Sequence, residues 1–134
     1  MAFIEAFERS EFQDSTLIIP IPLSKRRRIE RGFNQADILG EILAGSTGIK
    51  IDKLSLLRKT HSPIHRAAMD MKARELTVRN AFEITRPKLI EGQKILLVDD
   101  VFTSGATSSS CSRALKKSGA AKVCVLTLAR AVMD

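Results

Sequence analysis

The apolar and polar residues along the chain alternate between helical and strand spacing. Helical spacing occurs within residues 1–14, after Asn34 and after Ala106. Short apolar runs of the strand type lie between these segments, at residues 17–19, 49–58, 81–84, 94–98 and 123–129. Strands that alternate with helices in this way predict an α/β fold, in which a mostly parallel twisted sheet is flanked by helices.

Two of the predicted helices carry sequence signals at their ends. Asn34, with Asp37 three residues later, is typical of an N-cap with an acidic partner, and Gly45 is expected to end this helix. The last helix is expected to run from Ala106 to Gly119. The apolar positions expected to face the core are Ala36, Leu39, Ile42 and Leu43 in the first of these helices, and Cys111, Ala114 and Leu115 in the second.

Three of the strands have features that bear on the sheet. Pro20 and Pro22 are expected to end the strand at residues 17–19, because proline has no N–H to donate to a ladder. Residues 49–58 predict one strand that ends in Arg58. The nearly continuous apolar run at 123–129 predicts a strand that is buried on both faces.

The N-terminal helix, within residues 1–14, places Phe3, Ile4 and Phe7 on one face and acidic residues on the other. A second subunit of a homodimer is one surface against which this apolar face could pack. The chain of 134 residues is long enough for one hydrophobic core, so residues 1–134 are predicted to form a single domain.

The composition argues against a membrane or secreted protein. No apolar run approaches the roughly 20 residues of a membrane-spanning helix, and no basic region followed by an apolar signal core is found at the start. Cys111 and Cys124 have no CxxC partner and no histidine at metal-ligand spacing. This pattern favours reduced, buried thiols in a cytoplasmic protein.

The net charge of +7 suits an anionic ligand, whether a phosphate compound or a nucleic acid. Five of the eight residues at 24–31 (SKRRRIER) are basic. Because this run follows the end of a strand, it fits an anion-binding loop as well as a solvated one, and the pattern leaves both open. The chain has no Trp or Tyr, so surfaces on which bases could stack are scarce.

Residues 59–80 form a long polar and basic segment, which is typical of a lid or binding loop. His61 and His65 stand four residues apart, a spacing that on a helix could bind a metal. Pro63 lies between them and no acidic third ligand is near, so exposed loop histidines are the preferred interpretation.

The segment at residues 95–110 (ILLVDDVFTSGATSSS) has the strongest chemical pattern in the chain. An apolar strand ends in the acidic pair Asp99-Asp100, and a polar loop then leads into a helix. Carboxylates can accept hydrogen bonds from the hydroxyls of a ribose. Backbone amides and hydroxyls of the loop, together with the helix N-terminus, can hold a phosphate. The loop residues concerned are Thr103, Ser104, Gly105, Ala106 and Thr107.

Other motifs with an acidic or phosphate-binding turn do not match this segment. No lysine follows Gly105, so it is not a Walker loop, and one glycine is too few for the dinucleotide fingerprint. Val101 and Phe102 follow Asp100, so the second aspartate of a haloacid-type phosphatase is missing. A receiver domain needs a far longer chain after its acidic pair. Recognition of a phosphorylated ribose is the interpretation that remains.

The motif ILLVDDVFTSGAT resembles the phosphoribosyl-pyrophosphate (PRPP) motif of type I phosphoribosyltransferases. The wider chain resembles the ComF branch (competence protein F-like, or predicted amidophosphoribosyltransferases). The segment IPIPLSKRRRIERGFNQA, at 19–36, is similar without a gap to the signature of that branch. Shorter matches are LLRK at 56–59, NAF at 80–82 and GAAKVCVLTLARA at 119–131.

The resemblance implies a role for each matching position. Asp99 and Asp100 would contact the ribose hydroxyls and act as catalytic residues, and residues 103–107 would hold the 5-phosphate. Residues 59–80 would be the hood, a flexible loop that covers the acceptor. The cofactor would be Mg²⁺, held mainly by substrate oxygens rather than by protein ligands. The pyrophosphate would be bound by Leu23, Ser24, Lys25 and Arg31.

The sequence departs from the family pattern at three points. The four-cysteine zinc ribbon with which members usually begin has no counterpart, so a fragment or shortened member is expected. Arg66 or His65 stands where the hood usually has Gln. The later R-x-x-N pattern ends in Thr77 instead of Asn. These changes affect the acceptor side, and the donor side is intact.

The expected function is therefore transfer of the phosphoribosyl group from Mg·PRPP to a nitrogen acceptor, a base or an amine, with release of pyrophosphate. Two alternatives remain open at this stage. One is a non-catalytic module that senses PRPP or a nucleotide. The other is a competence-associated accessory protein that binds single-stranded DNA or other competence proteins, which the basic run from Lys25 to Arg28 favours.

Overall fold

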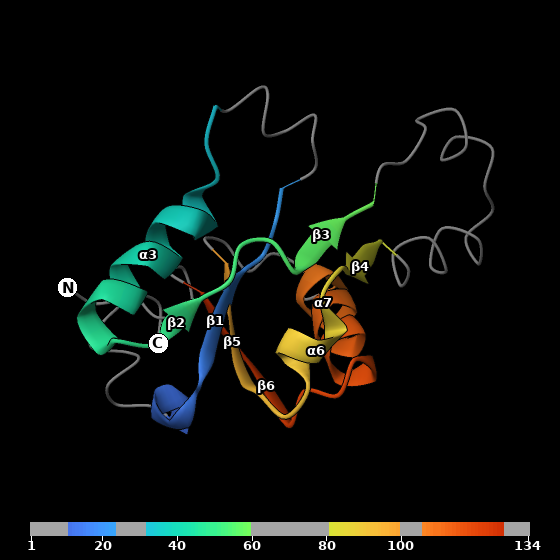
Figure 1. Cartoon of the computed structure of the whole chain (residues 1–134). Helices are drawn as coiled ribbons and strands as arrows, with labels where there is room; N and C mark the ends of the chain where they lie inside the picture. Colours follow the sequence, from blue (N-terminus) through green and yellow to red (C-terminus); the bar gives the residue numbers. More distant parts are fainter. Residues whose placement is uncertain (1–10, 24–31, 60–80, 100–105, 128–134) are drawn as a thin grey trace.

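A parallel sheet and a smaller antiparallel strand pair organise the chain, as Figure 1 shows. The computed structural model describes residues 11–23, 32–59, 81–99 and 106–127. In chain order the elements are the 3₁₀-helix η1 (Glu11–Asp14), β1 (Leu17–Pro20), α3 (Gln35–Thr47), β2 (Lys50–Ile51), β3 (Leu56–Arg58), β4 (Phe82–Ile84), α6 (Pro87–Ile90), β5 (Lys94–Asp99), α7 (Ala106–Lys117) and β6 (Lys122–Thr127).

The four-stranded sheet has the order β2-β1-β5-β6, and every neighbouring pair is parallel. Its two faces are covered by different helices (Figure 1). Ile18, Leu96 and Val98 point to the face that packs against Leu39 and Leu43 of α3. The opposite face packs on α6, α7 and the β3–β4 pair. The predicted α/β fold, with a mostly parallel sheet flanked by helices, is confirmed.

The first strand continues through Pro20, where the sequence pattern predicted that it would end. Pro20 pairs with Val98, and the amide of Ile21 still donates to the Val98 carbonyl at 2.9 Å. The Ile18 carbonyl accepts from Asp52, so Ile18 and the alternate residue Pro20 face β2. Since β2 ends at Ile51, the N–H that proline lacks would have no strand to pair with.

The strand predicted at residues 49–58 is divided into two, and only the first part joins the parallel sheet. A turn at Asp52 separates them: its carboxylate accepts from the amides of Leu54 and Ser55 at 2.9 and 3.0 Å and from the Ser55 hydroxyl at 2.5 Å. Burial raises the pKa of Asp52, but these hydrogen bonds and the charge of Arg86 outweigh it and hold the pKa below its ordinary value. After the turn, β3 pairs antiparallel with β4.

The helix after Asn34 runs one turn further than predicted. The cap itself is confirmed, but Gly48, with φ of 77°, ends the helix and its amide donates to the Ala44 carbonyl. Gly45 lies inside the helix because its backbone is not left-handed. Ile42 was predicted to face the core, but its side chain is 37% exposed. Gly40, which was not predicted to face the core, is buried.

The last helix and strand agree with the prediction in position but not wholly in burial. In α7, Cys111 and Leu115 are buried, and Gly119 follows the helix with φ of 98°. Strand β6 stands at one side of the described sheet, and its residues 122–125 are half-buried rather than enclosed on both faces. Residues 1–10, most of the predicted N-terminal helix, and 60–80, nearly all of the predicted hood, lie outside the described residues.

None of the helices within the described ranges is long and apolar enough to cross a membrane.

The close approach of α3 to the sheet at Gly40 generates the first prediction. A Cβ on Gly40 would lie 3.0 Å from Ile51 Cδ1 and 3.1 Å from Pro20 Cγ, whereas a Cβ on Gly45 of the same helix would meet nothing within 4 Å. Both substitutions gain the helix preference of alanine, so crowding separates them. We expect Gly40→Ala to be less stable than Gly45→Ala by about 1–3 kcal/mol in urea unfolding. Equal stabilities would show that the sheet yields to the extra methyl.

Candidate functional site

The carboxyl ends of β1 and β5 lie side by side and bring two chemically distinctive segments together. The strands pair in parallel from Leu17 with Ile95 to Pro20 with Val98. Residues 21–23, which lead into the basic run, therefore leave the sheet beside Asp99, the last residue of β5. Ligands of open α/β sheets bind at such carboxyl edges. The structure places the described ends of both predicted loops at one edge.

The predicted site residues fall partly inside the described ranges. Leu23 and Asp99 are half-buried at the carboxyl edge. Ala106 begins α7, and Thr107 is half-buried in its first turn. Asp99 lies opposite Thr127 in the β5–β6 ladder. The other predicted site residues lie outside the described residues, and their roles stay predictions: Ser24, Lys25, Arg31, Asp100, Thr103, Ser104 and Gly105.

Asn34 connects the two ends of the basic loop, a role that the sequence pattern did not predict. It is 6% exposed, and its Nδ2 donates to the Ile21 carbonyl at 3.1 Å. Its Oδ1 accepts from the Ala36 amide at 3.1 Å, so one side chain serves both as the cap of α3 and as a bond to the end of β1. The loop between Ile21 and Asn34 therefore starts and ends at a fixed place. The Asn in the matching 19–36 segment was the available sequence signal.

Arg58 is a second residue that sequence reasoning did not assign to the site. It ends β3, and its Nε donates to the Pro22 carbonyl at 3.3 Å. The guanidinium carbon lies 4.7 Å from the centre of the Phe82 ring on β4. Arg58 thus links the antiparallel pair to the first residues of the basic loop. The matching LLRK segment contains this arginine, but only the tertiary structure shows its contact with Pro22.

Cys111 lies beneath the carboxyl edge, within electrostatic reach of both Arg58 and Asp99. Burial raises the pKa of the Cys111 thiol to about 12; the charge of Arg58 works against this rise, and that of Asp99 adds to it. The thiol is therefore neutral and inert near neutral pH. Its buried position agrees with prediction, whereas Cys124 is half-buried. Cys111 is a packing residue of the site floor, not a nucleophile.

The described residues hold no group of three or more His, Cys, Asp or Glu side chains that could bind a metal ion. His61 and His65 lie outside those residues. Asp99 supplies one carboxylate at the edge. A carboxylate is an oxygen ligand of the kind that Mg²⁺ takes together with substrate phosphates, so Asp99 fits the expected ion.

Comparison with known proteins identifies relatives along most of the chain, although no protein-family model matches it. The chain is 36% identical over 115 residues to the DNA utilization protein YhgH of Salmonella typhi, covering 84% of the chain and 48% of the relative. It is 35% identical over 119 residues to competence protein ComFC of Bacillus subtilis, covering 85% of this chain and 44% of the relative. It is 34% identical over 116 residues to competence protein F of Haemophilus influenzae, covering 85% of this chain and 50% of the relative. The chain thus spans about half the length of these curated relatives.

Solved structures with a similar fold are larger enzymes. The glutamine phosphoribosylpyrophosphate amidotransferase of B. subtilis superposes with a TM-score of 0.61 and 21% identity, over 92% of this chain and 24% of the enzyme. A structure described as the allosteric regulatory enzyme of purine biosynthesis gives the same TM-score and identity, over 94% of this chain and 24% of its own. At this identity the likeness shows the fold alone. The chain is therefore similar to these YhgH and competence proteins over about half of their length, and it has the fold of type I phosphoribosyltransferases.

Proposed function

We propose that the carboxyl edge of the sheet binds Mg·PRPP and that the chain transfers the phosphoribosyl group to a nitrogen acceptor with release of pyrophosphate. The observation that carries the proposal is the convergence at one edge of Asp99, the start of α7 and the beginning of the basic loop. The PRPP-type motif at residues 95–107 spans the first two of these features. The relatives' names and the fold are compatible with the proposal.

In this proposal the substrate lies across the ends of β1 and β5. Asp99 and Asp100 accept hydrogen bonds from the ribose hydroxyls. Residues 103–107 bind the 5-phosphate at the N-terminus of α7, a helix of 12 residues whose dipole favours an anion there. The pyrophosphate is bound by Leu23, Ser24, Lys25 and Arg31.

The reaction breaks the bond between C1 of the ribose and the pyrophosphate oxygen, and the oxygen keeps the electron pair. A nitrogen lone pair forms the new bond to C1, and the acceptor nitrogen releases its proton to the leaving pyrophosphate or to water. Positive charge develops on the ribose between these events, so the carboxylates of Asp99 and Asp100 stabilise it. Mg²⁺, when bound with the substrate, would neutralise charge on the leaving pyrophosphate. The chain would otherwise contribute orientation, because it would hold the ribose and the pyrophosphate at one edge of the sheet.

Calorimetric titration with Mg·PRPP tests the donor site. We expect the Asp99→Asn/Asp100→Asn variant to bind at least tenfold more weakly, because each amide loses a charge-assisted acceptor. Asp14→Asn is the matched control. Asp14 pairs with Lys94 and Lys122 in exposed contacts at the other edge of the sheet, so its loss should not change binding.

Absence of binding by the folded native chain would refute the donor site. A pyrophosphate-release assay over a panel of bases and amines, including ammonia, then separates transfer from sensing. Release with one acceptor supports the transferase, whereas binding without release for any acceptor supports the non-catalytic PRPP-sensing alternative.

The Asn34 connection gives a second test of the site. Asn34→Asp keeps an N-cap acceptor but loses the donor to the buried Ile21 carbonyl, so we expect a loss of about 1–3 kcal/mol in the free energy of unfolding. Mg·PRPP should also bind more weakly, because the basic loop is then held less firmly. Gln35→Glu makes the same amide-to-carboxylate change at the next, half-buried position and is the control. If the Asn34→Asp variant is destabilised but binds Mg·PRPP as tightly as the native chain, the hydrogen bond from Asn34 to Ile21 does not contribute to the site.

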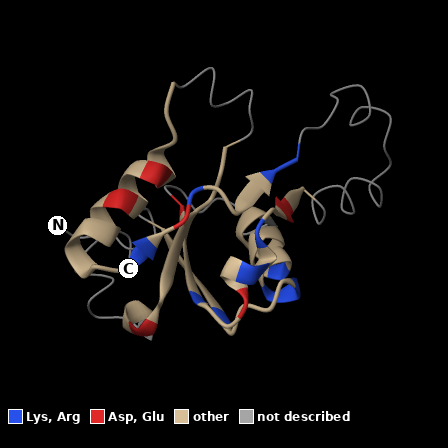
Figure 2. Ribbon diagram, viewed as in Figure 1, with Lys and Arg blue, Asp and Glu red and all other residues tan. Residues whose placement is uncertain are grey.

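A basic groove favours a second candidate function, binding of the single-stranded DNA backbone. The groove has a volume of about 650 Å³, and none of the described residues that line it is Asp or Glu. Figure 2 shows Lys and Arg along α7. Three of the similar proteins have names that refer to DNA utilization or competence. The lining residues are Ser108, Ser109, Ser112, Arg113, Lys116, Lys117 and Val125.

Filter binding with single-stranded DNA over a series of salt concentrations tests this function. Replacing Arg113, Lys116 and Lys117 with Gln should lower the slope of log affinity against log salt by about 2, since each phosphate contact contributes roughly 0.7. Lys88→Gln, an exposed cation of α6 outside the groove, should leave the slope unchanged. An unchanged slope in the triple variant would show that single-stranded DNA does not bind in this groove.

A further inference from the structure

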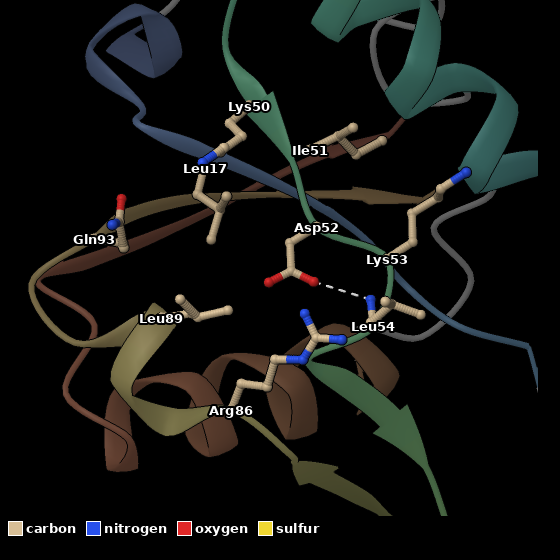
Figure 3. A pocket seen from close by; sticks show the side chains of 9 residues that line it. All are labelled: Leu17, Lys50, Ile51, Asp52, Lys53, Leu54, Arg86, Leu89 and Gln93. Carbon is tan, nitrogen blue, oxygen red and sulfur yellow. Dashed lines mark hydrogen bonds between the residues drawn. The ribbon is translucent and has the colours of Figure 1, made fainter.

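A pocket of about 480 Å³ lies at the amino-terminal edge of the sheet, on the other side from the candidate PRPP site (Figure 3). Leu17, the first residue of β1, lines it, whereas the PRPP loops follow the last residues of β1 and β5. The β2 strand, the Asp52 turn and α6 supply the other walls. The pocket is therefore separate from the proposed substrate site, and a role for it does not depend on PRPP binding.

The walls of the pocket carry exposed leucine side chains. Leu54 is 59% exposed at the turn, and Leu89 is 48% exposed on α6. Leu17, which is 5% exposed, forms an apolar floor, and Figure 3 shows Leu17 and Leu89 directed into the space. Single exposed leucines are common on protein surfaces, but two that line one concavity form a site where a partner's apolar group can be buried.

The charged groups around these leucines favour an acidic partner. Lys50, Lys53 and Arg86 line the pocket together with one carboxylate, that of Asp52. The Asp52 carboxylate already accepts hydrogen bonds from Leu54 and Ser55 within the turn.

The cations differ in their contacts. Lys53 pairs with Glu41 of α3, away from the pocket. In the described part of the chain, by contrast, no carboxylate lies within 4 Å of the charged nitrogens of Lys50 or Arg86. Lys50 and Arg86 can therefore approach the carboxylates of a ligand, although the charge of Arg86 also acts on Asp52.

We propose that this pocket is a docking site for an acidic peptide segment of a partner protein. An apolar side chain of the segment packs on Leu17 and Leu89, with Leu54 at the rim beyond Arg86, and carboxylates next to it pair with Lys50 and Arg86. An apolar centre with a charged rim that includes arginine is the usual anatomy of a protein interface. The volume is within the range of roughly 300–1,000 Å³ that specific ligand sites occupy.

Selection of phage-displayed random peptides on the purified full chain tests the proposal and does not require the partner to be identified. We expect a consensus in which a large apolar residue lies within two positions of Asp or Glu. Synthetic peptides with this consensus should bind in calorimetry, and their affinity should fall at least tenfold in Leu54→Ser/Leu89→Ser. In Lys50→Gln/Arg86→Gln it should fall about three- to tenfold and lose most of its dependence on salt.

Matched controls lie on the same molecule. Leu57→Ser changes a leucine of β3 that is 39% exposed, and Lys88→Gln changes a cation of α6; neither lines the pocket, and both should keep native affinity. Since the pocket leucines are exposed, their variants should keep the native Tm and the native affinity for any ligand of the carboxyl edge.

Three results would overturn the proposal: no enriched consensus, a consensus without acids, or selected peptides that bind the Leu54→Ser/Leu89→Ser variant as well as the native chain. A fragment screen by ligand-observed NMR runs in parallel. Fragments that bind at Leu54 and Leu89, with no selected peptide, would make the pocket a small-molecule site and exclude peptide docking.

Discussion

The parallel pairing of β1 with β5 is the contact on which the candidate site depends. Both strands are buried between α3 on one face and α6 and α7 on the other, and their central residues are almost fully enclosed. A shift of one residue in this pairing would exchange the side chains that pack on α3 with those that pack on α6 and α7, so the fit of the two cores fixes the register. With the register fixed, Ile21 and Asp99 leave the sheet together. The basic loop and the acidic pair then follow from the same edge.

Two polar side chains hold the beginning of the basic loop against this edge. Asn34 bonds the Ile21 carbonyl and caps α3, and Arg58 bonds the Pro22 carbonyl while its guanidinium lies over Phe82. Buried donors and acceptors of this kind are costly to leave without partners, so they hold the backbone in one arrangement. The antiparallel β3–β4 pair contributes to the same edge through Arg58.

The two edges of the sheet differ in chemistry. The carboxyl edge combines a carboxylate with the start of α7 and a basic loop, which suits a phosphorylated ribose. At the amino edge, exposed leucines stand among cations, which suits an acidic peptide. The Asp52 turn creates this second surface, because it takes the chain out of the parallel sheet after Ile51 and presents Leu54 to solvent. The two proposed binding surfaces thus lie at opposite edges of one sheet.

The sequence by itself determined the features that depend on neighbouring residues. These are the helical and strand periods, the Asn34 cap, the apolar strand that ends in Asp99, and the α/β class. Tertiary structure decided the features that depend on distant residues. Pro20 stays in its strand because β2 has already ended beside it, and residues 122–125 of β6 are half-buried because β6 stands at one side of the described sheet. Gly48 rather than Gly45 ends α3. Either glycine can adopt the left-handed conformation, so the local pattern does not distinguish them. Arg58 joins the site only because β3 leaves the main sheet, and no local pattern records a contact between residues 36 positions apart.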